Sequence, residues 1–288
     1  MIPIYKKEMR TYFTQMMGYL FLAFLLLLIG MFFILANVRN RDAGFHHVLV
    51  GTSTFLLFLV PILTMRLFSE EARNKTDQLL FTSPLSVTQI VLGKFFAAFT
   101  LFMIAVAIAA IFPLLLGRFA ESMPTSRIVG AFIGWILLGI CCIAVGVFIS
   151  VITNSQIVAA VGTFAALFIM FLMDAFAIVM PTTTLASLIF VGIIILAVAG
   201  IWYNSTRNVI SSGIVACVGV IIAVVLYLIN SLIYDGIIVR VLNWFSIYAR
   251  FDSFASGILH LSDIVYYLSF CALFVYLSIN VIEKRRWR

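Results

Sequence analysis

Charged residues are scarce in this chain. Of its 288 residues only 10% are Asp, Glu, Lys or Arg, whereas 64% are hydrophobic. Soluble domains have about a quarter of their residues charged. The mean hydropathy of +1.21 also lies far outside the range of soluble domains. The composition therefore excludes an ordinary soluble domain and predicts an all-α, polytopic helical membrane protein.

A phosphate-binding loop is also missing, because the pattern GxxxxGK[ST] occurs nowhere in the sequence. Each membrane crossing needs about 20 apolar residues, so the length leaves room for roughly six to nine helices and no large soluble domain. We expect no nucleotide-binding domain, no cofactor and no covalent chemistry in this chain.

Cysteine and histidine are few and are not arranged to bind metal. The cysteines lie inside apolar runs and are expected to pack as small hydrophobic residues. They are Cys141, Cys142, Cys217 and Cys271. His46 and His47 are adjacent, so on a helix they point apart, and only Asp42 lies near them at ligand spacing. We predict neither a metal site nor a catalytic residue.

Apolar runs long enough to cross a bilayer recur along the whole chain. We predict eight crossings, at about 17–36, 48–65, 90–116, 128–151, 157–179, 185–203, 209–234 and 264–282. The two runs within 185–234 read as a helical hairpin whose turn contains Asn204 and Arg207. Lys94 lies near the start of the third crossing, where we expect its amino group to snorkel into water.

Two segments mix aromatic and charged residues, as segments at a membrane surface do. Residues 1–16 predict an elbow helix in the interface, and residues 243–263 predict a segment at the outer surface. Eight crossings place both termini on one side, which carries twelve Lys and Arg residues against six on the other. This bias predicts a multi-pass protein of the cell membrane with both termini in the cytoplasm.

The longest strongly polar stretch lies at 66–94, between the second and third crossings. Its charged residues must face water, because charges at a bilayer centre are costly. Pro84 biases Ser83 away from helical geometry, and Ser86 with Gln89 has the spacing of a capping box, so the third crossing begins at a defined residue. The loop at 66–89 is therefore short and stiff, although residue types alone fit an ordinary solvated loop equally well.

Several motifs in this loop resemble the permease subunits of ABC-2 type transporters at matching spacing. They are Ser69-Glu70-Glu71, Thr76, Leu79-Leu80, Thr82-Ser83-Pro84 and Leu92-Gly93-Lys94. The resemblance implies that a short helix at about 75–81 docks on a separate ATPase subunit and couples it to transport. Lys75 and Gln78 stand where the family commonly has Gly and Glu. The residues implied in the ATPase contact are Glu70, Glu71, Arg73, Lys75, Thr76, Asp77, Gln78, Leu79, Leu80, Phe81, Thr82, Ser83 and Pro84.

The resemblance covers about 1–180 and 245–288, and the end of the chain is similar to the gliding-motility branch of the family. The hairpin at 185–234 has no counterpart in a six-crossing permease. The resemblance implies an ABC ATPase that binds ATP and magnesium, a homo- or heterodimer of permeases, contact with lipid but not nucleic acid, and a possible accessory subunit with a large outer domain. The transported substrate stays open.

Two other interpretations come from different protein classes. Asp252, His260 and Asp263 could serve a membrane-embedded transferase, since His260 lies three residues before Asp263. Asp174, the one carboxylate well inside an apolar run, could serve a proton-coupled carrier. It lies about 27 Å beyond Gln156 along a helix, near the outer interface, which favours a hydrated acid over a proton relay.

Overall fold

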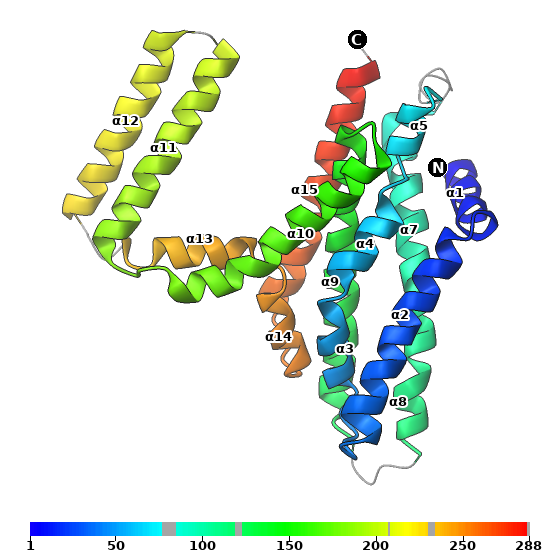
Figure 1. The fold of residues 1–288 in the computed structure, drawn as a ribbon. Helices are drawn as coiled ribbons and strands as arrows, with labels where there is room; N and C mark the ends of the chain where they lie inside the picture. The colour runs from blue at the N-terminus through cyan, green and yellow to red at the C-terminus, as the bar shows by residue number, and fades with distance from the viewer. Residues whose placement is uncertain (77–84, 119–122, 207, 230–233, 287–288) are drawn as a thin grey trace. The chain divides into compact units, whose positions relative to one another are not determined.

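The computed structural model describes residues 1–76, 85–118, 123–206, 208–229 and 234–286. Every regular element in these ranges is a helix, which confirms the all-α prediction (Figure 1). Seven of the described helices are long and apolar enough to cross a membrane, or eight if α3 (His46–Ser53) and α4 (Leu56–Thr64) form one bent span. The prediction of about eight crossings agrees with this result.

The chain folds as two compact units, Met1–Ile169 with Ile247–Arg288, and Met170–Ser246. The first unit also contains α1 (Ile2–Thr14), α2 (Met17–Phe33), the π-helix η1 (Ile34–Val38), α5 (Ser69–Arg73), α7 (Val87–Ala109), α8 (Ile111–Leu116), α9 (Thr125–Ile152), α14 (Ala249–Ala255) and α15 (Leu261–Arg286). The second contains α11 (Thr184–Thr206), α12 (Val209–Ile229) and α13 (Ile237–Phe245), and α10 (Gln156–Val179) begins in the first unit and ends in the second.

Helix α9 is the centre of the first unit. Its most apolar stretch is 67% buried, compared with 17% for the first crossing. Glycines on α9 let its neighbours approach closely: a Cβ at Gly134 would lie 2.5 Å from Phe254 of α14, and one at Gly146 would lie 2.2 Å from the hydroxyl of Thr64 on α4. Because such contacts are impossible for a larger residue, these glycines fix where α4 and α14 pack.

The second crossing is broken, with α3 and α4 meeting at 63°. Before the break, the Thr52 hydroxyl donates to the Val48 carbonyl at 2.8 Å and the Ser53 hydroxyl donates to the Val50 carbonyl at 2.7 Å. Such bonds compete with the helix ladder, and Pro61 further along lacks the N–H that a regular helix would use. The continuous run expected at 48–65 is therefore two helices.

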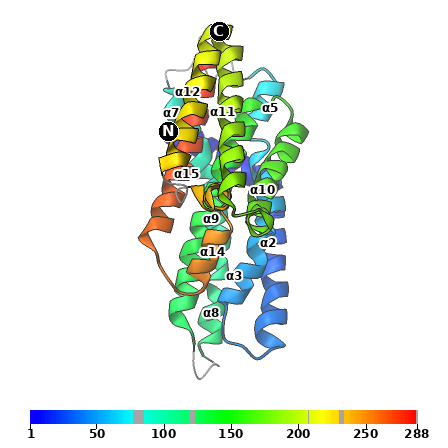
Figure 2. The same ribbon diagram turned by 90° about the vertical axis from the view of Figure 1, so that its left-hand side faces the viewer.

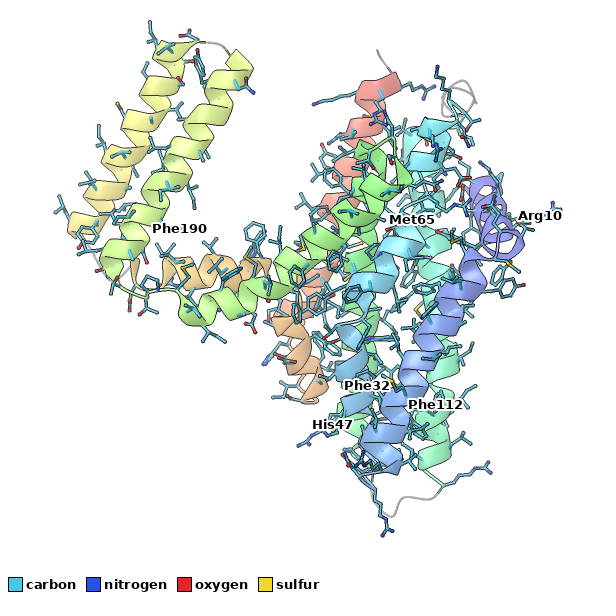
Figure 3. All side chains as sticks on the ribbon, in the orientation of Figure 1. Arg10, Phe32, His47, Met65, Phe112 and Phe190 are labelled. Atoms are coloured by element: carbon cyan, nitrogen blue, oxygen red, sulfur yellow. The ribbon has the colours of Figure 1, made fainter. Side chains whose placement is uncertain are left out.

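A helix, α1, is present where the elbow was predicted, and its inner face is more polar than the sequence suggested. Ile4, Glu8 and Tyr12 are buried at four-residue spacing on one face. The Tyr12 hydroxyl donates to the carbonyl of Leu63 at 3.0 Å. Arg10 is exposed and points away from the unit (Figure 3). One face of α1 is thus packed against protein.

The second unit contains the predicted hairpin, in which α11 and α12 lie side by side (Figure 2). Large apolar side chains such as Ile193 and Leu196 are 59% and 61% exposed, as expected for a surface in contact with lipid. Tyr234 closes the base of the hairpin, where its hydroxyl donates to the carbonyl of Ala223 at 2.8 Å. Cys217 is exposed on α12, whereas the other three cysteines are buried.

Candidate functional site

At one end of the first unit, α5, the start of α7 and the ends of α9 and α15 lie together (Figure 1). Arg285 near the end of α15 donates to the carbonyl of Ile152 at the end of α9, at 3.0 Å. This end also carries the beginning of the polar loop that the sequence singled out. Side chains from several helices hold α5 in place.

Lys94 on α7 is the centre of this polar end. Its amino group lies 2.9 Å from Oε1 of Glu8 on α1 and 2.9 Å from Oε2 of Glu71 on α5. It also donates to the carbonyl of Leu67 and lies 5.0 Å from the ring centre of Phe68. The side chain is only 1% exposed, so the expectation that it snorkels into water is wrong.

The physical reason is the close approach of α1 to α7. A Cβ at Gly93 would lie 3.2 Å from the side chain of Ile4, so α1 covers α7 next to Lys94. This covering leaves the Lys94 side chain almost fully buried and brings Glu8 to its amino group as a counter-charge. A buried charge is tolerated when it is paired and hydrogen-bonded, as it is here.

Glu71 connects the buried lysine to a second one at the surface. While its Oε2 faces Lys94, its Oε1 accepts a hydrogen bond from Lys7 of α1 at 2.8 Å. Burial lowers the pKa of Lys7, but the hydrogen bond with Glu71 and the charges of Glu71, Glu8 and Glu70 raise it above its usual value overall. We call Lys7, Glu8, Glu71 and Lys94 the ion cluster. Its two positive and two negative charges balance.

A second ion pair extends the polar end. Arg66 donates to one carboxylate oxygen of Glu70 through Nε at 2.8 Å and Nη2 at 2.7 Å, and it also donates to Gln15. A polar cleft of about 210 Å³ lies beside these residues and reaches the ion cluster. Next to it, burial and the charge of Glu8 raise the pKa of Tyr12, while the charge of Arg66 partly offsets this effect.

The start of α5 is held from another side by Ser150 of α9. The fully buried Ser150 hydroxyl accepts from the backbone N–H groups of Phe68 at 3.1 Å and Ser69 at 3.3 Å. It also lies 3.3 Å from the carbonyl of Met65, to which it donates. A helix of five residues is not stable alone, so α5 depends on these contacts and on the ion cluster.

The beginning of α7 agrees with the sequence. The side chain of Ser86 accepts from the backbone N–H of Gln89 at 3.3 Å, which confirms the predicted N-cap. An open cleft of about 570 Å³ lies between this first turn and the end of α15, where Glu283 and Arg286 line it. The first turn of α7 therefore starts beside the basic end of the chain.

Five of the residues implied in the ATPase contact are described. Glu70 and Glu71 are part of α5, and Arg73, Lys75 and Thr76 are exposed just beyond or at its end. Lys75 has a φ of 56°, the left-handed conformation that glycine adopts readily, which explains why a glycine suits this position. The predicted residues Asp77, Gln78, Leu79, Leu80, Phe81, Thr82, Ser83 and Pro84, and with them most of the helix expected at 75–81, lie outside the described residues.

The sequence did not predict which residues hold α5, although Lys94 is part of a motif quoted for the resemblance. These residues are Lys7, Glu8, Arg66, Lys94 and Ser150. A partial signal existed for Glu8, because it lies midway between Ile4 and Tyr12 at helical spacing on a face that is otherwise apolar. Ser150 had none, since a serine in an apolar helix commonly bonds its own backbone.

The residues of the other two interpretations lie elsewhere. Asp263 is paired with Arg250 at 2.8 Å, and the Arg250 guanidinium lies 3.9 Å from the ring centre of Tyr266. His260 is exposed and precedes α15, and Asp252 is exposed on α14. Asp174 is half-buried on the part of α10 that belongs to the second unit.

Histidine at the opposite end contacts a carboxylate. His47 Nε2 lies 3.4 Å from Asp42 Oδ2. The ring centres of His46 and His47 are 4.0 Å apart, so the expectation that these side chains point apart is wrong. Among the residues that the structure describes, no group of three or more His, Cys, Asp and Glu side chains is placed to hold a metal ion.

Comparison with known protein families matches residues 35–201 to the family described as ABC-2 family transporter protein. The match includes the bent second crossing, α5, Lys94 and Ser150. Comparison with curated proteins gave no match, and comparison with solved structures gave none.

Proposed function

Because the chain belongs to the ABC-2 family of transporter proteins, we propose that it couples ATP hydrolysis by a separate ATPase subunit to the export of a substrate. Family membership makes it a multi-pass permease component of an ABC transporter, and such permeases generally work with an ABC ATPase. The coupling, the direction of transport and the role of the polar loop are the proposed part.

The observation that carries the proposal is the anchoring of α5. This short helix lies at the beginning of the polar loop. The ion cluster ties it to α1 and α7, and Ser150 ties it to α9. A force that a partner exerts on the loop would therefore be transmitted to three helices at once. A solvated loop without a partner has no need of such anchoring, whereas a coupling element does.

The loop residues have two different roles in this proposal. Leu79, Leu80 and Phe81 provide an apolar anchor for a cleft on the ATPase, and the exposed Arg73 and Lys75 lie at its rim. Buried apolar anchors commonly dominate the energy of an interface, while rim charges mainly affect association. ATP and Mg²⁺ would be bound by the ATPase subunit and not by this chain.

Orientation and assembly complete the proposal. The Lys and Arg bias supports a cytoplasmic position for the termini and the loop, where an ATPase can reach it. We further propose a dimer of permeases in the cell membrane. A relation to the gliding-motility branch and an accessory subunit with an outer domain rest on the resemblance of residues 250–269 and 283–288.

The test is copurification. The tagged chain, extracted from its native host in mild detergent, is expected to bring down an ATPase subunit that mass spectrometry identifies. Phe81→Ala is expected to lower the amount of ATPase recovered, whereas Asp252→Asn, far from the loop in sequence, serves as the control and should not. If the chain purifies without an ATPase at low and at high salt, the proposed function is wrong.

A further inference from the structure

We propose that the ion pair between Glu71 and Lys94 is the contact that opens when the polar loop moves, while the contacts of Ser150 hold the start of α5 in place. In this view α5 pivots about its N-terminal end. The inference rests on the proposed function, because it takes the motion of the loop to be driven by ATP hydrolysis in the partner.

The ion cluster can separate into two neutral pairs. If Glu71 moves away from Lys94, Lys94 keeps Glu8 at 2.9 Å, and Glu71 keeps Lys7 at 2.8 Å. Opening an ordinary buried ion pair leaves a charge without a partner, which is very unfavourable. Here no charge is abandoned, so this particular contact can open at low cost.

The two lysines of the ion cluster differ in exposure. The side chain of Lys7 is 57% exposed, so its flexible arm can follow Glu71 as α5 shifts. The side chain of Lys94 is 1% exposed and is held by Glu8 and by the carbonyl of Leu67. Lys94 therefore stays in place on α7 when Glu71 leaves.

Water can solvate Glu71 and Lys94 as they separate. The polar cleft of about 210 Å³ is lined by both partners of the contact, Glu71 and Lys94. A water molecule takes about 30 Å³ of liquid volume, so the cleft has room for several that can solvate these groups as they separate. By contrast, Ser150 is fully buried, and breaking its bonds would leave the backbone N–H groups of Phe68 and Ser69 unpaired.

The contrast between the Glu71–Lys94 contact, which opens, and the contacts of Ser150, which persist, defines the direction in which α5 moves. Ser69 is the first residue of α5, and Asn74 follows its last residue. At 1.5 Å per residue, Asn74 lies about 7.5 Å beyond Ser69 along the helix, so a rotation about Ser69 displaces Asn74 more than Glu71. The polar loop continues from this moving end.

The test measures the distance between α5 and α1 in the complex with the ATPase. Spin labels at Asn74→Cys and Arg10→Cys report it by double electron–electron resonance, in a Cys217→Ser background because Cys217 is the exposed native thiol. The labelled complex is first checked for ATP hydrolysis. Trapping it with ATP and vanadate is expected to shift the mean distance by about 2 Å or more.

Isosteric substitutions of the two carboxylates that pair with Lys94 should have opposite effects. Glu71→Gln weakens the contact that opens, so the shifted distance is expected without nucleotide. Glu8→Gln removes the partner that Lys94 needs after opening, so the nucleotide-free distance is expected to persist after trapping. Glu71→Asp keeps the charge but shortens its reach, and it should shift the distance in the same direction as Glu71→Gln.

Three results would overturn the inference. The wild-type distance could stay unchanged on trapping although the complex hydrolyses ATP. The Glu71 variants could keep the wild-type nucleotide-free distance. The Glu8→Gln variant could respond as the Glu71 variants do, which is what a purely structural cluster predicts. Failure to recover any ATPase is a different result, because it refutes the proposed function and removes the basis of the inference with it.

Discussion

Replacing Lys94 by Met is the sharpest test of the buried ion cluster. Methionine fills a similar length of side chain but has no charge, so Lys94→Met leaves Glu8 and Glu71 facing a site without its central cation. Both carboxylates are largely shielded from water, with side chains that are 10% and 13% exposed. The substitution therefore tests charge compensation more than packing.

The magnitude follows from what remains around the two carboxylates. Removing one partner of a buried ion pair commonly costs about 3–5 kcal/mol. Two features reduce this cost here: Lys7 still lies 2.8 Å from Glu71 and 4.0 Å from Glu8, and the cleft beside the cluster admits water. We expect a loss of about 2–4 kcal/mol in the free energy of unfolding.

A second substitution should recover part of the loss. In Lys94→Met with Glu8→Gln, one positive and one negative charge are removed together, and Lys7 remains paired with Glu71. No lone buried charge is left, so the cost relative to wild type is expected to fall to about 1–2 kcal/mol. The double variant should thus be more stable than Lys94→Met alone.

Unfolding in mixed detergent micelles, followed by tryptophan fluorescence, measures these differences, since Trp135 is fully buried on α9. Single and double variants form a double-mutant cycle that isolates the coupling between Lys94 and Glu8. A loss below about 1 kcal/mol for Lys94→Met, or a double variant less stable than the single one, would refute the argument that the cluster balances buried charges.

Three further predictions concern α5, the loop and the hairpin. Ser150→Ala removes the acceptor of two backbone N–H groups and is expected to cost about 1–3 kcal/mol in the same unfolding assay. Ser278→Ala, whose hydroxyl donates to the carbonyl of Phe274 in its own helix, should cost clearly less. Phe81→Ala is expected to abolish ATP hydrolysis that depends on coupling, since an interface anchor commonly contributes about 2 kcal/mol or more. Asp252→Asn should leave this hydrolysis largely intact. The reverse pattern in an ATPase assay would favour the embedded transferase. A cysteine at Asn204 should react with an impermeant thiol reagent only from the cytoplasmic side, and labelling only from outside would mean that the hairpin is re-entrant or the crossing count is wrong.

The crossings and the start of α7 follow from local features of the sequence. A run of about 20 apolar residues has to be helical in a bilayer, whatever surrounds it, because its backbone groups can find partners only within the helix. The Ser86 cap depends on residues three positions apart, so it too is readable locally. The prediction was less accurate for the second crossing, where side-chain bonds at Thr52 and Ser53 and the bend they accompany leave no mark in the hydropathy.

The candidate site likewise has one part that the sequence predicts and one part that it does not. The sequence by itself determined that a polar loop at 66–94 interrupts the apolar runs, because charged residues cannot stay in hydrocarbon. Only the tertiary structure decided what holds that loop: Lys94 meets Glu8 across 86 positions of the chain, and Ser150 meets Ser69 across 81. Whether a lysine near a helix end reaches water or a buried carboxylate depends on which helix covers it, and here α1 covers it. That is a property of packing between distant segments, which no local pattern contains.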